Sequence, residues 1–240
     1  MKFQYISDLH LEFGNKVKLE KLADYLILAG DICKLKYKNV FYNFIKEVSE
    51  EFKLVFFVTG NHEYYNSDIS SVNSLIEEIF NEFENVIFLN NKIYEFSDSE
   101  VVIFGTTLWT HIPEEKTKII KKKMNDYFYI KNFTPKDSTK LFNKNYTFIK
   151  ETIKNYSNKK LIFVSHHLPQ MYLIDKEYQG SDINYAFASD IPELDNSCVV
   201  ACVYGHTHTN SIQGKYYCNP LGYPNENKKR NLNKIFEIKF

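Results

Sequence analysis

The chain of 240 residues is long enough to bury a large core and carry an enzyme site, and we expect one domain over residues 1–240. Its 30 basic and 30 acidic residues are interleaved and balance to a net charge of zero, which disfavours a basic face for duplex DNA. No apolar run approaches the roughly 20 residues of a membrane span. Polar Asp8 and His10 stand where a signal peptide would have its apolar core, so we expect a cytoplasmic protein with reduced cysteines.

Arg230 is the only arginine in a chain that is rich in lysine and asparagine. Bidentate guanidinium forks on phosphate are therefore limited to this one position. Any oxyanion that the protein binds must be held mainly by metal ions, histidine, asparagine, lysine and backbone N–H groups.

Five apolar runs have the length and the β-branched, aromatic and leucine content of buried strands. Each run ends at a residue that can bind a metal ion. The runs are residues 3–7, 25–29, 54–59, 161–165 and 199–204, and the residues that follow them are Asp8 and His10, Asp31, Asn61 and His62, His166 and His167, and His206 and His208. In an open α/β sheet the ligand crevice lies beyond the carboxyl ends of the strands. If the five runs form one sheet, these side chains gather at one rim.

The remaining elements are predicted from periodicity. Apolar residues at helix spacing predict helices over 39–52 and 69–83, the second with Ser67 or Asp68 as its N-cap. Further strands are expected near 85–89, 93–96, 101–105, 210–213 and 215–218, with an edge strand at 235–240. The lysine-rich and aromatic-rich segment 106–159 differs in composition, and we interpret it as an insertion with helices at 114–123 and 138–156.

The individual motifs differ in how strongly they indicate a site. Asp8 with His10, or Gly30 with Asp31, could each be an ordinary turn after a strand. An Asn61-His62 pair after an apolar strand has no packing rationale and is more specific. His206 and His208 follow Gly205 at a spacing that can present two imidazoles on one face of an extended segment.

The donor types fit two metal ions. Imidazole, carboxylate and amide oxygen suit manganese, iron, zinc, nickel or cobalt better than a calcium cage. A carboxylate can bridge two cations, and Asp31 is the candidate. Two dications against the carboxylates of Asp8 and Asp31 leave two positive charges, which match a phosphate. Two ions about 3.5–4 Å apart can also hold a hydroxide between them and clamp the attacking and leaving oxygens.

The ordered set Asp8-x-His10, Gly30-Asp31, Gly60-Asn61-His62-Glu63, His166 and Gly205-His206-Thr207-His208 resembles the calcineurin-like metallophosphoesterase superfamily. The segments 105–109, 124–127, 186–190 and 218–220 are also similar to small, single-domain members of a bacterial and viral-type branch. The resemblance covers nearly the whole chain. It implies an α/β fold in which a two-sheet β-sandwich is flanked by helices, with the metal site at the carboxyl ends of the strands.

The resemblance also implies roles for individual residues. One metal ion would be held by Asp8, His10, Asp31 and His208, and the other by Asp31, Asn61, His166 and His206. His62 matches the family's catalytic histidine, which contacts the phosphate and can protonate the leaving oxygen. For Glu63 we expect a hydrogen-bond acceptor or helix-start carboxylate rather than a catalytic group. Manganese is the first choice of cofactor, with iron, zinc, nickel, cobalt or magnesium as alternatives.

Three further residues are candidates for substrate binding. His167 follows the ligand His166 and either lines the pocket or bonds to nearby backbone. Tyr127 and Tyr129, in the aromatic insertion, either stack on a nucleobase or belong to a satellite core. In relatives, arginines commonly stand at the positions of Phe128 and Leu221, and their absence bears on which substrate is bound.

The sequence thus predicts a dinuclear phosphoesterase that acts on a small phosphate ester, a nucleotide or cyclic nucleotide in first place. A nuclease is the alternative, favoured by Lys121, Lys122 and Lys123 but disfavoured by zero net charge. A third class is a scaffold that keeps the fold without the chemistry, and the complete set of metal donors argues against it.

Overall fold

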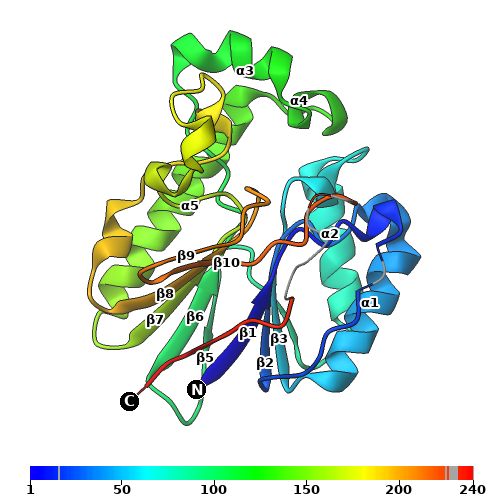
Figure 1. The fold of residues 1–240 in the computed structure, drawn as a ribbon, viewed down its shortest axis with the longest axis vertical. Helices are drawn as coiled ribbons and strands as arrows, with labels where there is room; N and C mark the ends of the chain where they lie inside the picture. The colour runs from blue at the N-terminus through cyan, green and yellow to red at the C-terminus, as the bar shows by residue number, and fades with distance from the viewer. Residues whose placement is uncertain (16, 225, 227–231, 240) are drawn as a thin grey trace.

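The computed structural model describes residues 1–15, 17–224, 226 and 232–239. Two β-sheets pack face to face, and helices cover their outer faces (Figure 1). The predicted two-sheet sandwich flanked by helices is therefore confirmed. Arg230 and Phe240, the end of the predicted edge strand, lie outside the described residues.

The first sheet has five strands in the order β11-β1-β2-β3-β4. β1 to β4 run parallel to their neighbours, and β11 pairs antiparallel with β1. The bounds are β1 Lys2–Ile6, β2 Tyr25–Ala29, β3 Leu54–Val58, β4 Val86–Phe88 and β11 Ile235–Glu237. β2 and β3 are apolar on both faces because one face packs on helices and the other on the second sheet.

The second sheet has six strands in the order β5-β6-β7-β8-β10-β9, of which β5 and β9 are antiparallel edges. The bounds are β5 Lys92–Glu95, β6 Val101–Gly105, β7 Lys160–Val164, β8 Val199–Tyr204, β9 Ser211–Gln213 and β10 Tyr216–Cys218. The five ligand-bearing strands are thus divided, with β1, β2 and β3 in one sheet and β7 and β8 in the other. The single-sheet interpretation is wrong, yet the two sets of carboxyl ends meet: the backbone N–H of His206 donates to Asp8 Oδ1 at 3.0 Å.

Three long helices cover the sandwich. α1 (Lys38–Glu51) and α2 (Ile69–Phe80) pack their apolar faces on the first sheet, and α5 (Pro135–Asn155) packs on the second (Figure 1). Asp68 is the N-cap of α2, where its side chain accepts the Ser71 N–H at 2.9 Å. α5 begins three residues before the predicted start, because Thr134 and Asp137 form a capping box around Pro135.

The segment 106–159 contains the short helices α3 (Thr117–Lys123) and α4 (Asp126–Tyr129) in addition to α5. α3 and α4 lie beyond the carboxyl ends of the strands (Figure 1). A satellite core joins this segment to the loop before β8, and its buried members are Ile112, Ile120, Met124 and Ala186. A 2.6 Å ion pair between Lys116 and Asp182 connects the same two segments.

The four cysteines are buried free thiols, as expected. Within the described part of the chain, none of the helices has the length and apolar character that a bilayer crossing requires.

Candidate metal centre

The predicted ligands converge at the common rim of the two sheets. Three groups of side chains each place one donor atom per residue within 4.8 Å of the others. The groups are Asp8, His10 and His208; His10, Asp31 and His62; and Asp31, His166 and His206. Asn61 joins the last group, with its Oδ1 3.1 Å from His166 Nε2. His10 and Asp31 each belong to two of the groups. Asp31 Oδ2 lies 3.8 Å from His10 Nε2 and 3.5 Å from His166 Nε2, between the two ligand sets as a bridging ligand would be.

The backbone at five of these positions is left-handed. The φ angles are 52° at Asp8, 46° at His10, 54° at Asp31, 69° at His206 and 50° at His208. Non-glycine residues rarely adopt this conformation, and strain of this kind concentrates at functional sites, at about 1–3 kcal/mol per residue. It turns each side chain sharply out of its strand toward the rim.

Glycines let the ligand loops approach one another closely. A Cβ atom at Gly60 would lie 2.6 Å from the backbone nitrogen of Asp31, and one at Gly205 would lie 2.8 Å from Asp8 Oδ2. Any side chain at either position would push a ligand loop away. Gly60 and Gly205 therefore have a packing function that the sequence alone did not reveal.

Three candidate ligand histidines are oriented by an oxygen acceptor on their outer ring nitrogen. The Nδ1 partners are Glu12 Oε1 for His10 at 3.4 Å, the Ala29 carbonyl for His166 at 2.9 Å and Glu226 Oε2 for His208 at 2.7 Å. Carboxylates and carbonyls accept, so each Nδ1 carries a proton and each Nε2 presents its lone pair to the centre. This is the arrangement that orients metal-binding histidines in proteins.

The inner donor atoms lie close together, although unprotonated Nε2 atoms and carboxylate oxygens cannot hydrogen-bond to one another. His10 Nε2 and His208 Nε2 are 3.0 Å apart, and His166 Nε2 is 3.5 Å from Asp31 Oδ2. His206 Nε2 is buried and has no hydrogen-bond partner among the described residues. A buried lone pair without a partner is costly, and a cation at this point would satisfy it. The residues present therefore fit a pair of divalent metal ions.

His62 is held at three points. Its backbone N–H donates to Asp31 Oδ1 at 2.8 Å, its Nδ1 is 3.0 Å from Glu12 Oε1, and its Nε2 is 3.1 Å from the Tyr223 hydroxyl. Burial lowers the pKa of His62, but the charges of Asp31 and Glu12 outweigh it, so that the pKa is raised. Burial raises the pKa of Asp31, while the charges of His166 and His62 hold it well below its usual range.

Glu63 organises the backbone of the ligand loops. Its buried carboxyl accepts the N–H groups of Gly60 at 2.6 Å, Asp31 at 3.0 Å, Ile32 at 2.7 Å and Cys33 at 3.1 Å. Burial raises its pKa, and the negative charge of Asp31 adds to the effect. Its contacts are those of the hydrogen-bond acceptor that the sequence predicted rather than those of a group facing the pocket.

Sequence reasoning missed two buried carboxyls in the outer shell. Glu12 bridges His10 and His62, although it stands only two residues after His10. Asp126, from α4, accepts from Asn61 Nδ2 at 2.8 Å and so directs Asn61 Oδ1 toward His166. Both belong to segments that resemble the family, yet nothing in one sequence indicated what they touch.

The three predicted substrate residues lie away from the pocket. His167 is 1% exposed, packs between Trp109 and His206, and places Nδ1 3.3 Å from the Thr107 carbonyl, which is the backbone alternative. Tyr127 stacks on Phe133 at 5.7 Å and packs against two core clusters. Tyr129 is half-exposed, with its ring 5.4 Å from that of Tyr65. None of the three lines the pocket, and the contacts of Tyr127 are those of the satellite-core alternative.

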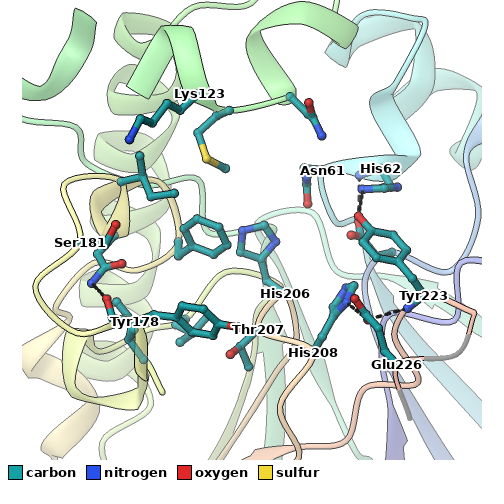
Figure 2. Close-up of a pocket in the computed structure, with 18 of the residues that line it drawn as sticks. Asn61, His62, Lys123, Tyr178, Ser181, His206, Thr207, His208, Tyr223 and Glu226 are labelled. Atoms are coloured by element: carbon teal, nitrogen blue, oxygen red, sulfur yellow. Dashed lines mark hydrogen bonds and ion pairs between the residues drawn. The ribbon is translucent and has the colours of Figure 1, made fainter. Parts of the chain in front are cut away.

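A pocket of about 450 Å³ opens beside the centre (Figure 2). Its lining includes Asp31, Asn61 and His206. Tyr223 lies at one side, near His62 (Figure 2). The opposite wall comes from the end of α3 and the loop before β8, and its members include Lys123, Met124, Ile174, Ile183 and Phe187. The Phe187 ring lies 4.7 Å from the ring of His206. Phe187 is thus the aromatic residue that connects the wall to the metal centre.

Comparison with known proteins agrees with this geometry. The family model described as Calcineurin-like phosphoesterase matches residues 1–210. The chain is 35% identical over 265 residues to uncharacterized protein L509 of Acanthamoeba polyphaga mimivirus, covering 95% of this chain and 93% of that protein.

Among solved structures, phosphopantetheinyl hydrolase (PptH) of Mycobacterium tuberculosis superposes with a TM-score of 0.72 at 17% identity, covering 95% of this chain and 92% of that one. A putative 5'-nucleotidase of Staphylococcus aureus gives 0.51 at 12% identity, covering 92% of this chain and 48% of that one. At these identities the likeness concerns the fold.

Proposed function

The chain belongs to the calcineurin-like phosphoesterase family, and we propose that it is a dinuclear hydrolase of a nucleotide or cyclic nucleotide. The convergence of inward-facing Nε2 atoms, each with its Nδ1 held from outside, is the observation that supports this most directly. In this proposal Asp8, His10, Asp31 and His208 hold one cation, and Asp31, Asn61, His166 and His206 hold the other.

Two divalent cations would neutralise the phosphate and activate a water for attack on phosphorus. The protein's own residues orient the groups around that reaction. Glu12 accepts the Nδ1 proton of His62, so that Nε2 is the ring nitrogen that faces the pocket. His62 then assists the leaving group by supplying a proton as the bond to phosphorus breaks. Asp31 connects His62 to the candidate metal ligands, because its Oδ1 accepts the His62 N–H while its Oδ2 faces the ligand histidines.

The pocket supports a substrate with a nucleoside-sized organic part. Its volume of about 450 Å³ is in the range of small-molecule sites, and Phe187 offers a ring face beside the metal ligands. The Staphylococcus aureus structure is that of a putative 5'-nucleotidase, which agrees with a nucleotide substrate.

A phosphopantetheinyl ester is the second candidate. The wall residues Met124, Ile174 and Ile183 are aliphatic, which suits an extended chain as well as a base. The name of the Mycobacterium tuberculosis structure, phosphopantetheinyl hydrolase, agrees with this alternative.

The test is a substrate panel with the manganese-loaded protein. It contains p-nitrophenyl phosphate, bis-p-nitrophenyl phosphate, nucleoside monophosphates, cyclic nucleotides, a phosphopantetheinyl ester and single-stranded DNA and RNA. We expect release of p-nitrophenol from a generic ester and the highest kcat/KM with a nucleotide. Preference for the pantetheinyl ester or for the polynucleotides would replace the nucleotide assignment. If the protein binds two metals but hydrolyses none of the esters, the proposed hydrolase activity is refuted.

A further inference from the structure

Tyr223 occupies the position between His62 and the open pocket. Its hydroxyl lies 3.1 Å from His62 Nε2 (Figure 2). Its ring lies 4.5 Å from the His10 ring and 4.7 Å from the His208 ring. The residue is 37% exposed and lines the pocket together with His62. A proton that leaves His62 Nε2 toward the pocket therefore meets the phenol oxygen first.

Backbone hydrogen bonds fix the turn that carries Tyr223 to the segment that carries the candidate ligand Asp8. The N–H of Leu221 donates to the Ser7 carbonyl at 3.0 Å, and the N–H of Gly222 donates to the Asp8 carbonyl at 2.9 Å. The N–H of Tyr223 itself donates to Glu226 Oε2, the same oxygen that accepts from His208 Nδ1. These bonds position the tyrosine relative to the ligands on both sides of the centre.

The partners of His62 leave one route for its proton. Glu12 accepts at Nδ1, and a carboxylate facing a ring nitrogen at 3.0 Å keeps that proton on the ring. Nε2 is then the nitrogen that exchanges a proton. Among the described residues, its hydrogen-bond partner is the Tyr223 hydroxyl. A phenol can accept a hydrogen bond and donate one at the same time.

The neighbouring Tyr65 differs in this respect. Its ring stacks on His62 at 4.3 Å, but its hydroxyl donates to Asp126 at 2.7 Å and accepts from Asn61 Nδ2 at 3.0 Å. That hydroxyl is used to hold the ligand Asn61. The hydroxyl of Tyr223 has His62 as its partner among the described residues, and when His62 is an imidazolium its Nε2–H donates to the phenol oxygen, so that the Tyr223 O–H can donate to a bound ester.

We propose that Tyr223 is a catalytic residue that relays the proton from His62 Nε2 to the leaving oxygen. The inference rests on the proposed hydrolase function. As the bond from phosphorus to the leaving oxygen breaks, its electron pair stays on that oxygen, which takes the proton of the Tyr223 hydroxyl. The Tyr223 oxygen simultaneously takes the proton from Nε2 of His62, which enters the step as an imidazolium. The products are an alcohol, a neutral tyrosine and a neutral imidazole that keeps its Nδ1 proton, and no group is oxidised or reduced.

The test compares Tyr223→Phe, His62→Ala and the double variant, all manganese-loaded, on two esters that share one phosphoryl group. The p-nitrophenyl ester has a leaving group that needs little protonation, and the phenyl ester has one that needs more. Tyr37→Phe, a half-exposed tyrosine away from the pocket, is the matched control. Metal content and thermal unfolding of each variant show that the fold and the centre are intact.

The relay predicts that Tyr223→Phe lowers kcat about 10²-fold on the phenyl ester, within the usual range for proton transfer, and only a few-fold on the p-nitrophenyl ester. The double variant should be no slower than His62→Ala, because both residues serve one path. Equal losses on the two esters, or losses that multiply in the double variant, would overturn the relay. Continued hydrolysis of the p-nitrophenyl ester in that case would leave the proposed hydrolase standing, whereas a wild-type protein inactive on both esters would overturn the two together.

Discussion

The rim of candidate metal ligands and the wall of the pocket are built in different ways. The rim consists of Asp8, His10, Asp31, Asn61, His166, His206 and His208. Each predicted rim ligand lies within a few residues of the carboxyl end of a buried parallel strand, and the packing of the two sheets brings both sets of ends to one rim. The wall is assembled from the end of α3, the loop before β8 and the turn after β10, which are far apart in sequence. The rim is therefore determined by local pattern, whereas the wall depends on how separate loops pack on one another.

The strongest test of the rim is Asp31→Asn, which removes the charge of the shared ligand. We expect kcat/KM to fall by more than about 10⁴-fold, beyond the range for loss of a proton-transfer group, together with loss of bound metal. Kinetics and elemental analysis of the purified variant check this. Asp98→Asn, an exposed aspartate, is the control. Full activity with both metals retained would remove the bridging role.

The next test separates chemistry from metal binding within the rim. His62→Ala should lower kcat by ~10²–10⁴-fold and keep both metals, because His62 acts on the leaving group in this account. The loss should be smaller for p-nitrophenyl than for phenyl esters. His111→Ala, an exposed histidine beside Phe142, is the control. Equal losses for both leaving groups would exclude proton donation and leave only charge stabilisation.

A smaller effect is expected at the wall. Stacking on a base contributes ~1–3 kcal/mol, so Phe187→Ala should raise KM for a nucleotide roughly 5- to 150-fold. The KM for a small aliphatic phosphate should hardly change. Phe128→Ala removes a ring that is 65% exposed and outside the pocket, and serves as the control. A similar rise for both substrates would mean that Phe187 acts through its neighbour His206 instead.

The smallest kinetic effect should come from Tyr127, for which the sequence left a binding wall and a satellite core as alternatives. Tyr127→Ala is expected to leave kcat and KM nearly unchanged while lowering stability by roughly 2–3 kcal/mol, less than the ~3–5 kcal/mol of a fully buried ring. The reason is that Tyr127 packs on Phe133 and the core. Thermal unfolding with parallel kinetics measures both quantities. A KM that rises for the nucleotide alone would instead show that Tyr127 contributes to nucleotide binding.

The contrast between rim and wall also explains what could be predicted from the sequence. Strand ends such as Asp8 and His206 were recognisable because an apolar run stops at a metal-binding residue. Asp126 and Glu226 were not, since each reaches the site from a loop whose direction depends on tertiary packing. The left-handed backbone at five ligand positions could not be predicted either, because aspartate and histidine do not indicate a positive φ angle as glycine does. The role of Tyr127 stayed open between two alternatives, because aromatic residues are typical of a core and of a binding wall alike.

The central claim is that the rim holds two cations that share Asp31. The most direct measurement is the metal content of the wild-type protein after manganese loading and removal of free metal, by elemental analysis against protein concentration. The account predicts two ions per chain, with loss of metal in Asp31→Asn measured alongside. One ion or none per wild-type chain would contradict it.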